Sequence, residues 1–408
     1  MLDIKTIRED FPILSQTVHG HPLVYLDNGA TTQLPEQVLE AVLEQYRRYQ
    51  ANIHRGIHYL SELSTARVEQ ARKAVAEFIR AAAPEEVVFT GGATQSINMA
   101  ARAFSDGVLR PGDTVVTTEM EHHSNLIPWQ EACRRTGAAL RIVHLTESGE
   151  LDMAELARYL DEHPKLVAVT WVSNVLGTVN HVEQIIAMAH DAGAAVLLDA
   201  AQAMRHGPVD VRSLDCDFLC FSGHKMMAPT GTGVLYGKRA WLDRLPPVCF
   251  GGGMVDEVTC EHAAYGELPF KFEAGTQNIA GIIGLSAAIE YLRGVGLSDI
   301  YRYEAEILAY TEDRLRERSF LDILGRPDKR AGAVSFNLQG LHYYDTAKLL
   351  DQLGIAVRSG HHCAQPLLAR FGLSGAVRVT PAFYNTREEI DALCAALDRI
   401  AALPMVRR

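Results

Sequence analysis

Short apolar runs recur through the middle of the chain and alternate with longer stretches of helical periodicity. The runs predict buried strands over residues 86–90, 114–118, 139–143, 166–171, 195–199, 218–221 and 233–236. Residues 182–192 carry apolar positions at helical spacing, and Gly193 is placed to end that helix. Strands that alternate with helices are typical of an α/β fold, in which helices cover both faces of a mostly parallel sheet.

The pattern changes after residue 248. Residues 249–271 contain Phe250-Gly-Gly-Gly-Met254 and little helical periodicity, which predicts a long loop or a hairpin. A long helical region follows over about residues 279–318. Apolar runs at 333–337, 355–358 and 376–379, with helices between them, predict a smaller α+β domain at the C-terminus.

Length and composition narrow the class of protein. The chain has 408 residues, 48% of them hydrophobic and 22% charged, which is sufficient for two or three structural units. A formal net charge of −11 without an extended basic cluster argues against nucleic acid as a partner. The N-terminus has no apolar signal region and no run approaches the roughly 20 apolar residues that span a bilayer, so no membrane is expected. The seven cysteines are scattered and odd in number, which favours a reducing compartment, with the cytoplasm as the expected location.

A lysine and an acid lie at the ends of two predicted strands. Lys225 follows one strand in the segment Ser222-Gly-His-Lys225, and Asp199 ends the preceding strand. In parallel sheets the ligand binds beyond the carboxyl ends of the strands. An enzyme that uses pyridoxal 5′-phosphate (PLP) needs a lysine that binds the cofactor covalently and a carboxylate that keeps its pyridinium nitrogen protonated. The Ser222 hydroxyl and the His224 imidazole are suited to bind the phosphate.

Two further motifs are suited to anionic groups. Gly91-Gly-Ala-Thr-Gln95 lies between a predicted strand and a helix, where backbone N–H groups and the Thr94 hydroxyl can bind a phosphate. Arg378 ends a strand of the smaller domain, and its planar guanidinium can bind a carboxylate through two hydrogen bonds. The alternative for Arg378 is a surface ion pair, which is common.

One cysteine stands apart from the others. Cys363 ends the segment Arg358-Ser-Gly-His-His-Cys363, whose arginine and histidine side chains can lower the pKa of a thiol and present a thiolate. A zinc site is not expected at residues 361–363, because three adjacent residues do not easily converge on one tetrahedral ion. Cys260, in the long loop, is expected to be exposed. Buried and inert positions are expected for Cys133, Cys216, Cys220, Cys249 and Cys394.

Four motifs occur together in a fixed order: Glu121-His122-His123-Ser-Asn125, Asp199-Ala-Ala-Gln202, Ser222-Gly-His-Lys225 and Arg358-Ser-Gly-His-His-Cys363. This set resembles the motifs of group II cysteine desulfurases of the SufS type, which are similar to selenocysteine lyases, over about residues 11–400. The resemblance implies PLP-dependent transferase fold type I (class V aminotransferase-like). It also implies a large domain at 21–295, a small domain at 296–408, and residues 1–20 packed on the small domain.

The resemblance also implies roles for single residues. Lys225, Cys363 and His122 would be catalytic, with His122 stacked on the PLP ring. Thr276 would reach across a dimer interface to the partner's cofactor phosphate, and Gln202 would bind the cofactor's phenolic oxygen. The implied cofactor-binding set also contains Asp199, Ser222, His224, Thr94 and Asn174, and the implied substrate-binding set contains Arg378, Asn174 and Arg358. The chain departs from the family's usual pattern at Ala93, Gln95 and Gln277.

The implied reaction is the removal of sulfur from L-cysteine, which gives L-alanine and a persulfide on Cys363. A sulfur acceptor of the SufE or SufU type would take the persulfide for iron–sulfur cluster assembly, and the enzyme would be a homodimer that turns over slowly alone. One alternative is a selenocysteine lyase, which acts on L-selenocysteine and does not need Cys363. The others are an aminotransferase- or kynureninase-like enzyme and a non-catalytic assembly protein.

Overall fold

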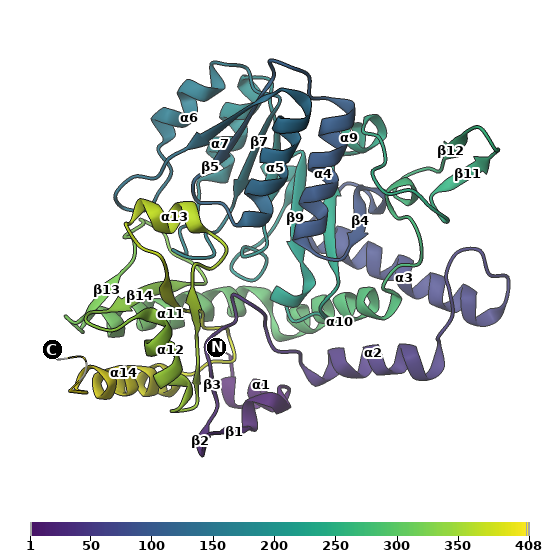
Figure 1. The fold of residues 1–408 in the computed structure, drawn as a ribbon. Helices are drawn as coiled ribbons and strands as arrows, with labels where there is room; N and C mark the ends of the chain where they lie inside the picture. The colour runs from purple at the N-terminus through teal and green to yellow at the C-terminus, as the bar shows by residue number, and fades with distance from the viewer. Residues whose placement is uncertain (1, 405, 407–408) are drawn as a thin grey trace.

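The computed structural model describes residues 2–404 and 406. Its largest sheet has seven strands in the order β4-β10-β9-β8-β7-β5-β6 (Figure 1). Neighbouring strands from β9 to β6 are parallel, whereas β10 is antiparallel to both β9 and β4. The expected α/β fold with a mostly parallel sheet is therefore confirmed. The strands are β4 (Val87–Thr90), β5 (Thr114–Thr118), β6 (Ala139–Val143), β7 (Leu166–Thr170), β8 (Ala195–Asp199), β9 (Phe218–Ser222) and β10 (Gly233–Gly237).

Helices cover both faces of this sheet because successive strand side chains point to opposite faces. Val196 and Leu198 of β8 belong to a core that contains buried residues of α3, α7 and α10, whereas Leu197 packs with residues of α4 and α5. The chain thus forms three layers, with the sheet in the middle. The helices of this part are α2 (Glu36–Arg48), α3 (Tyr59–Phe78), α4 (Ala93–Gly107), α5 (His123–Thr136), α6 (Met153–Leu160), α7 (Val182–Asp191), α8 (Val211–Leu214), α9 (Arg239–Arg244) and α10 (Ile279–Val295).

A second, antiparallel sheet is formed by the C-terminal part of the chain. Its strands lie in the order β13-β14-β17-β16 and share a separate apolar core with α11, α12 and α14 (Figure 1). The short strand β3 (Val24–Tyr25) runs parallel to β15 (Ile355–Ala356), which brings the start of the chain beside this unit. The bounds are β13 (Leu321–Ile323), β14 (Val334–Leu338), β16 (Arg358–Gly360), β17 (Ala376–Val379), α11 (Leu297–Arg316), α12 (Tyr343–Asp351), α13 (Gln365–Arg370) and α14 (Arg387–Ala401).

The helical region expected over about residues 279–318 is present as two helices. The chain breaks at Gly296, whose φ of +105° favours glycine, and α10 and α11 meet at 81°. One expectation from the sequence is corrected. Cys249 is exposed rather than buried, because it lies in the loop between α9 and β11, outside any helix or strand. Cys133, Cys216, Cys220 and Cys394 are buried and Cys260 is exposed, as expected.

The predicted hairpin is present. Strands β11 (Val255–Val258) and β12 (Ala263–Tyr265) are antiparallel and project from the body of the molecule (Figure 1). The remaining elements near the N-terminus are α1 (Ile4–Glu9), β1 (Thr17–Val18) and β2 (His21–Pro22). Among residues 2–404 and 406, no single helix has the length and apolar character to cross a membrane, and only the bent pair α10–α11 meets that test together.

Candidate active site

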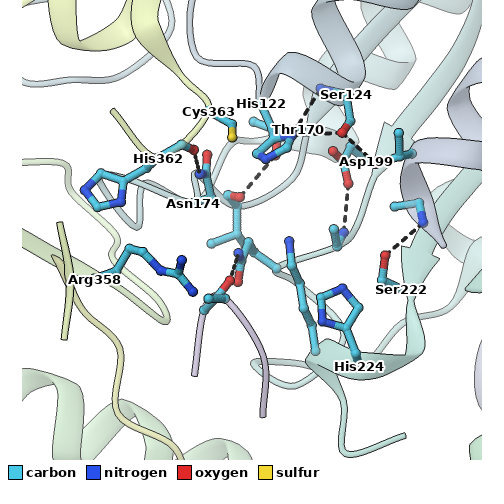
Figure 2. A pocket seen from close by; sticks show the side chains of 18 of the residues that line it. His122, Ser124, Thr170, Asn174, Asp199, Ser222, His224, Arg358, His362 and Cys363 are labelled. Atoms are coloured by element: carbon cyan, nitrogen blue, oxygen red, sulfur yellow. Dashed lines mark hydrogen bonds between the residues drawn. The ribbon is translucent and has the colours of Figure 1, made fainter. Parts of the chain in front are cut away.

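A cavity of about 350 Å³ opens at the carboxyl ends of the parallel strands and is closed on its other side by the C-terminal part of the chain. This is the edge where ligands bind in open α/β sheets. Figure 2 shows Arg358, Asn174 and Cys363 on one side of the cavity, with Ser222 and His224 on the other. The structure brings nearly all the predicted site residues to its lining: Thr94, His122, Asn174, Asp199, Gln202, Ser222, His224, Lys225, Arg358, Cys363 and Arg378.

Asp199 and Lys225 lie in this cavity at the carboxyl ends of two neighbouring strands. Asp199 ends β8, and Lys225 lies in a single 3-10 turn directly after β9. Burial raises the pKa of Asp199, although the Ala201 N–H, which donates to Oδ1 at 2.9 Å, and the charge of Lys225 oppose that rise. Burial lowers the pKa of Lys225 to about 8, against the attraction of Asp199. The lysine is therefore readily deprotonated, as a nucleophile and proton carrier must be.

The opposite end of the cavity is suited to an anion. Helix α4 begins at Ala93, whose N–H donates to the Ser222 hydroxyl at 2.8 Å. The Thr94 hydroxyl, in the same first turn of α4, lies 2.7 Å from the Ser124 hydroxyl in the first turn of α5. Gly92 adopts a φ of +146°, and a Cβ there would lie 3.2 Å from Ser222 Oγ. Only glycine leaves this approach to the helix N-terminus open, and the partial positive charge of that terminus attracts a phosphate.

His122 precedes α5 and acts as its N-cap. Its Nδ1 accepts a hydrogen bond from the Ser124 N–H at 3.1 Å and lies 3.0 Å from the Ser124 hydroxyl. Burial, with the positive charges of Lys225 and Arg378, lowers the pKa of His122 to about 3. The imidazole is therefore neutral in the cavity at physiological pH, with one ring nitrogen fixed by its cap.

Behind His122 lies a buried network that the sequence did not indicate. The Glu121 carboxylate accepts hydrogen bonds from the Thr118 hydroxyl, the Thr170 N–H and the Asn125 amide at 2.6, 3.0 and 2.6 Å. The Trp129 indole N–H in turn donates to Asn125 Oδ1 at 3.1 Å. The network joins the ends of β5 and β7 to the first turns of α5 and so fixes the position from which His122 projects. Residues 121, 125 and 129 are spaced about one helical turn apart, and this spacing in the sequence could have indicated the network.

Cys363 is presented by a tight turn. Both His362 and Cys363 have left-handed backbone conformations, with φ of 50° and 54°. The turn is held by hydrogen bonds from the His123 N–H to Cys363 O at 2.7 Å, from the Asn174 amide to His362 O at 2.8 Å, and from the Cys363 N–H to His361 Nδ1 at 3.0 Å. Strained backbone that several contacts hold in place is typical of functional sites. The thiol is partly exposed and close enough to Lys225 for its charge to affect the pKa of the lysine.

Two arginines converge on the same side of the cavity as Cys363. Arg378 Nη1 donates to the backbone oxygen of Asn174 at 2.8 Å, and its Nη2 lies 3.4 Å from Asp27 Oδ1. Arg358 Nη2 lies 2.8 Å from Asp27 Oδ2. Asp27, which follows the strand β3, was not predicted from the sequence. An acid after an apolar run could have indicated it, but only two residues of that run form a strand in the sheet.

For two predicted residues the structure shows surroundings that the resemblance did not imply. Gln202 lines the cavity, and its Nε2 donates to the backbone oxygen of Gly29 at 2.9 Å. Thr276 does not line it and lies at a separate cavity of about 270 Å³, together with Gly91, Gln95 and Gln277. Among the described residues, no group of three or more His, Cys, Asp or Glu side chains is arranged to hold a metal ion.

Comparison with known proteins assigns the chain to a family. The model of the aminotransferase class-V family matches residues 24–393. The chain belongs to this family, among its cysteine desulfurases. It is 48% identical to a probable cysteine desulfurase of Halalkalibacterium halodurans, over 96% of this chain and 97% of that protein. It is 47% identical to the cysteine desulfurase of Pectobacterium atrosepticum, over 98% of each.

Solved structures of the family have the same fold. The apo cysteine desulfurase of Thermococcus onnurineus superposes with a TM-score of 0.93 at 40% identity and covers 98% of both chains. The cysteine desulfurase CsdA of Escherichia coli superposes with a TM-score of 0.90 at 38% identity, again over 98% of both chains. These relatives confirm the fold and the family that the motifs resemble, and they do not favour the selenocysteine lyase alternative.

The cofactor of this family is PLP, and the residues of the cavity fit it. Lys225 would provide the amine, Asp199 would provide a buried carboxylate, and the start of α4 with Ser222 and Thr94 would provide donors for a phosphate. The cavity volume of about 350 Å³ lies within the usual range for small-molecule sites. No other buried lysine lines this cavity among the described residues.

Proposed function

We propose that this chain removes sulfur from L-cysteine, releases L-alanine, and holds the sulfur as a persulfide on Cys363. One observation carries the proposal: the Cys363 thiol lines the same cavity as Lys225, Asp199 and Arg378. A PLP enzyme that transfers only amino groups needs the last three residues but not the first. The relatives named above act as cysteine desulfurases, which supports this reaction for the chain.

Lys225 and Asp199 would form the centre of the reaction. When bound, PLP withdraws the electron pair that remains on Cα after its proton leaves. Lys225 would attach the cofactor and, once released by the substrate amine, would take that proton, for which its pKa of about 8 is suited. Asp199 would pair with the pyridinium nitrogen, and the neutral His122 would stack on the ring and pass protons near it.

The remaining residues would place the cofactor and the substrate. Ser222, His224 and Thr94 would bind the phosphate at the start of α4, and Gln202 would bind the phenolic oxygen. Arg378, with Arg358 and Asn174, would hold the substrate carboxylate, because guanidinium groups bind carboxylates in a planar, bidentate way. A substrate fixed there would direct its side-chain sulfur toward Cys363, which lies on the same side of the cavity (Figure 2).

The sulfur transfer balances without an external oxidant. The Cys363 thiolate attacks the substrate sulfur, a sulfur–sulfur bond forms, and the carbon–sulfur bond breaks with its electron pair on the carbon side. Protonation of that carbon and release of the amino group from the cofactor give alanine, and the enzyme keeps one extra sulfur atom. The persulfide would then pass to an acceptor protein of the SufE or SufU type for iron–sulfur cluster assembly.

A homodimer is the proposed assembly. Thr276 lies outside its own chain's active-site cavity, as a residue that serves the partner's site would. Ile57 and Tyr59 are 95% and 74% exposed, and apolar side chains left in water support a subunit interface. The proposed location is the cytoplasm.

The proposed domains are residues 21–295 and 296–408, with residues 1–20 packed on the second. Contacts of α1 support that packing. The Arg8 guanidinium donates to Tyr384 O at 2.6 Å and pairs with Glu389 at 3.0 Å.

The test is product release from L-cysteine and from L-selenocysteine by the wild type and by Cys363→Ser, with a reductant present. We expect alanine release from cysteine to fall at least about 100-fold in the variant, because serine cannot form a persulfide, while the cofactor's visible absorption stays unchanged. Cys260→Ser is the matched control, since it removes an exposed thiol between β11 and β12 that lines neither of the two cavities described above, and it should retain wild-type activity.

Two outcomes would overturn the proposal. If Cys363→Ser released alanine from cysteine at the wild-type rate, the thiol would not take the sulfur. If the wild type released alanine only from selenocysteine, the chain would be a lyase. Addition of a SufE- or SufU-type protein to the wild type should accelerate alanine release from cysteine, and an unchanged rate would remove the acceptor from the proposal.

A further inference from the structure

Arg330 is a buried arginine in the loop between β13 and β14 of the C-terminal unit. Its side chain is 5% exposed, and its Nε lies 3.1 Å from Glu312 Oε2 on α11. Its Nη2 donates to Gly325 O at 3.0 Å and to Leu324 O at 3.3 Å, both in the same unit. Its Nη1 donates to Leu176 O, in the turn that follows β7 of the large sheet. One guanidinium group therefore connects the C-terminal unit to the large sheet.

The turn at residues 173–178 is held by the C-terminal unit along its whole length. It is closed by hydrogen bonds between its own ends, from the Gly177 N–H to Ser173 O at 3.0 Å and from the Ser173 N–H to Thr178 O at 2.9 Å. The four successive carbonyl oxygens of residues 174–177 each accept a hydrogen bond from the C-terminal unit. The donors are, in the same order, Arg378 Nη1 at 2.8 Å, the Ser335 hydroxyl at 2.6 Å, Arg330 Nη1 and the Ala331 N–H at 2.8 Å.

Asn174 is the residue through which this turn reaches the active site, because it lines the cavity. Its amide donates to His362 O at 2.8 Å, within the tight turn that presents Cys363 (Figure 2). Its backbone oxygen accepts the hydrogen bond from Arg378. A shift of residues 173–178 would therefore move a support of Cys363 and a support of Arg378 together.

We propose that Arg330 is a positioning residue for the sulfur transfer, which fixes the turn at 173–178 and, through Asn174, the places of Cys363 and Arg378. The proposal rests on the proposed function insofar as Cys363 takes the sulfur of a substrate that Arg378 holds. The attacking and attacked sulfur atoms must be close and aligned, and a displacement of about 1 Å can lower a rate by about 100-fold. Arg330 does not line the cavity, so it would act through the turn alone.

The forked shape of arginine is what this role requires. The three guanidinium nitrogens of Arg330 are directed to three places: Glu312, residues 324–325, and Leu176 in the turn. A lysine would keep the positive charge beside Glu312, but its single ammonium nitrogen cannot take the places of three. The charge of Arg330 and its hold on the turn can therefore be separated by substitution.

The experiment measures two rates in the PLP-loaded enzyme. The first is alanine release from L-cysteine, and the second is alkylation of Cys363 by iodoacetamide without substrate, followed by mass spectrometry of the peptide that contains it. In Arg330→Lys we expect alanine release to fall by about 10–100-fold, because the reacting groups are displaced. Alkylation should become at least about threefold faster, because a loosened turn opens Cys363 to the reagent more often. Unchanged visible absorption of the cofactor shows that the cavity still binds PLP.

Glu312→Gln is the matched control. It removes the charge that faces Arg330 but leaves the acceptors in residues 324–325 and 176, so both rates should stay within about twofold of the wild type. Ser335→Ala is a second way to loosen the same turn, because it removes the donor to Val175 O. It should change both rates in the same directions as Arg330→Lys, and it replaces that variant if the lysine protein does not fold.

A purely structural role for Arg330 would lower the free energy of unfolding without changing either rate of the folded enzyme. Changes of less than about threefold in either rate in folded Arg330→Lys, or in Ser335→Ala where only that variant folds, would overturn the proposal. Equal changes in Arg330→Lys and Glu312→Gln would also overturn it, since they would assign the effect to the buried ion pair.

The alkylation measurement does not depend on turnover. If the wild type released no alanine from cysteine, the proposed function would fail, and the alkylation rates alone would decide whether Arg330 positions Cys363.

Discussion

Lys225 has a pKa that suits its chemistry but opposes folding. Burial lowers its pKa from 10.5 to about 8, and Asp199 only partly offsets this. A buried ammonium group is tolerated less well in the folded protein than in the unfolded chain, where water solvates it. In the holoenzyme the cofactor removes this charge by binding the amine, so the cost falls on the cofactor-free protein.

Substitution of Lys225 by methionine should therefore stabilise the cofactor-free protein. At pH 7 we expect the free energy of unfolding to rise by about 3 kcal/mol, from a pKa shift of that size. Below pH 8 the wild type bears the full energetic cost of the buried Lys225 ammonium group. Between pH 8 and 10.5 the unfolded chain binds more protons than the folded one, so wild-type stability rises with pH and the gap narrows. Urea unfolding of the wild type and of Lys225→Met across that pH range measures the difference in their free energies of unfolding.

Lys238→Met is the control for this substitution. Lys238 lies 2.7 Å from Asp215 and 3.1 Å from Asp217, and these partners raise its pKa although burial opposes them. Its removal should lower stability or leave it unchanged. Equal gains from both variants would show that the added apolar surface, not the lost buried charge, is responsible.

At the scale of elements, the site depends on where strands end and helices begin. The Glu121, Asn125 and Trp129 network joins β5, β7 and α5 in the layer behind His122. All three side chains are fully buried. Burial raises the pKa of Glu121 to about 8 despite three donors, so the group titrates near neutral pH and depends on these hydrogen bonds.

Asn125→Leu tests the network. Leucine is close in size but cannot bond to Glu121 or to the Trp129 indole, and each buried group left without a partner costs about 1–3 kcal/mol. We expect the free energy of unfolding to fall by about 2–4 kcal/mol, measured with urea. Asn98→Leu, an exposed asparagine on α4, should change it by less than about 1 kcal/mol. An equal loss in both variants would contradict the role of the network.

The sequence was sufficient to predict the elements that have a strong apolar pattern. The strands from β5 to β8 match the predicted runs closely, because continuous apolar runs are typical of strands buried on both faces. Most of the predicted site residues line one cavity because many of them follow strands of the large sheet. Asp27 was missed because β3 has only two residues, too short for any period to be visible, and its partners lie more than 300 positions away. The break at Gly296 was not predicted because a glycine within a helical pattern does not by itself mark the end of a helix.

On the scale of the whole molecule, the large sheet and the C-terminal unit are joined by buried ions. Glu304 on α11 lies 2.5 Å from Arg205 Nη1 and 2.7 Å from His206 Nδ1, in the loop after β8, and accepts a hydrogen bond from the Phe383 N–H at 3.1 Å. The Arg205 and Glu304 side chains are 4% and 3% exposed. The loop that carries Asp199 and Gln202 is thus tied to α11, so the cavity and the joint between the two parts share one support.

This joint should weaken in acid. Burial would raise the pKa of Glu304, but Arg205 and His206 outweigh it and hold the pKa below the usual value of 4.5. The unfolded chain therefore takes up the proton first as pH falls, so the stability that Glu304 provides is complete above about pH 4.5 and is lost as pH falls through the folded-state pKa. The wild type should lose stability in that window.

The Glu304→Gln variant should lack this dependence of stability on pH. The variant leaves Arg205 without a counter-charge, so at pH 7 its free energy of unfolding should be lower by about 3 kcal/mol or more, a loss typical of a broken buried pair. As pH falls through the folded-state pKa of Glu304, which lies below 4.5, the wild type loses the same interaction, and the two curves should converge. Glu290→Gln, an exposed acid on α10, should follow the wild type throughout. Urea unfolding from pH 3 to 7 decides the matter: a difference that stayed constant across this range would show that shape at position 304, and not its charge, holds the two parts of the molecule together.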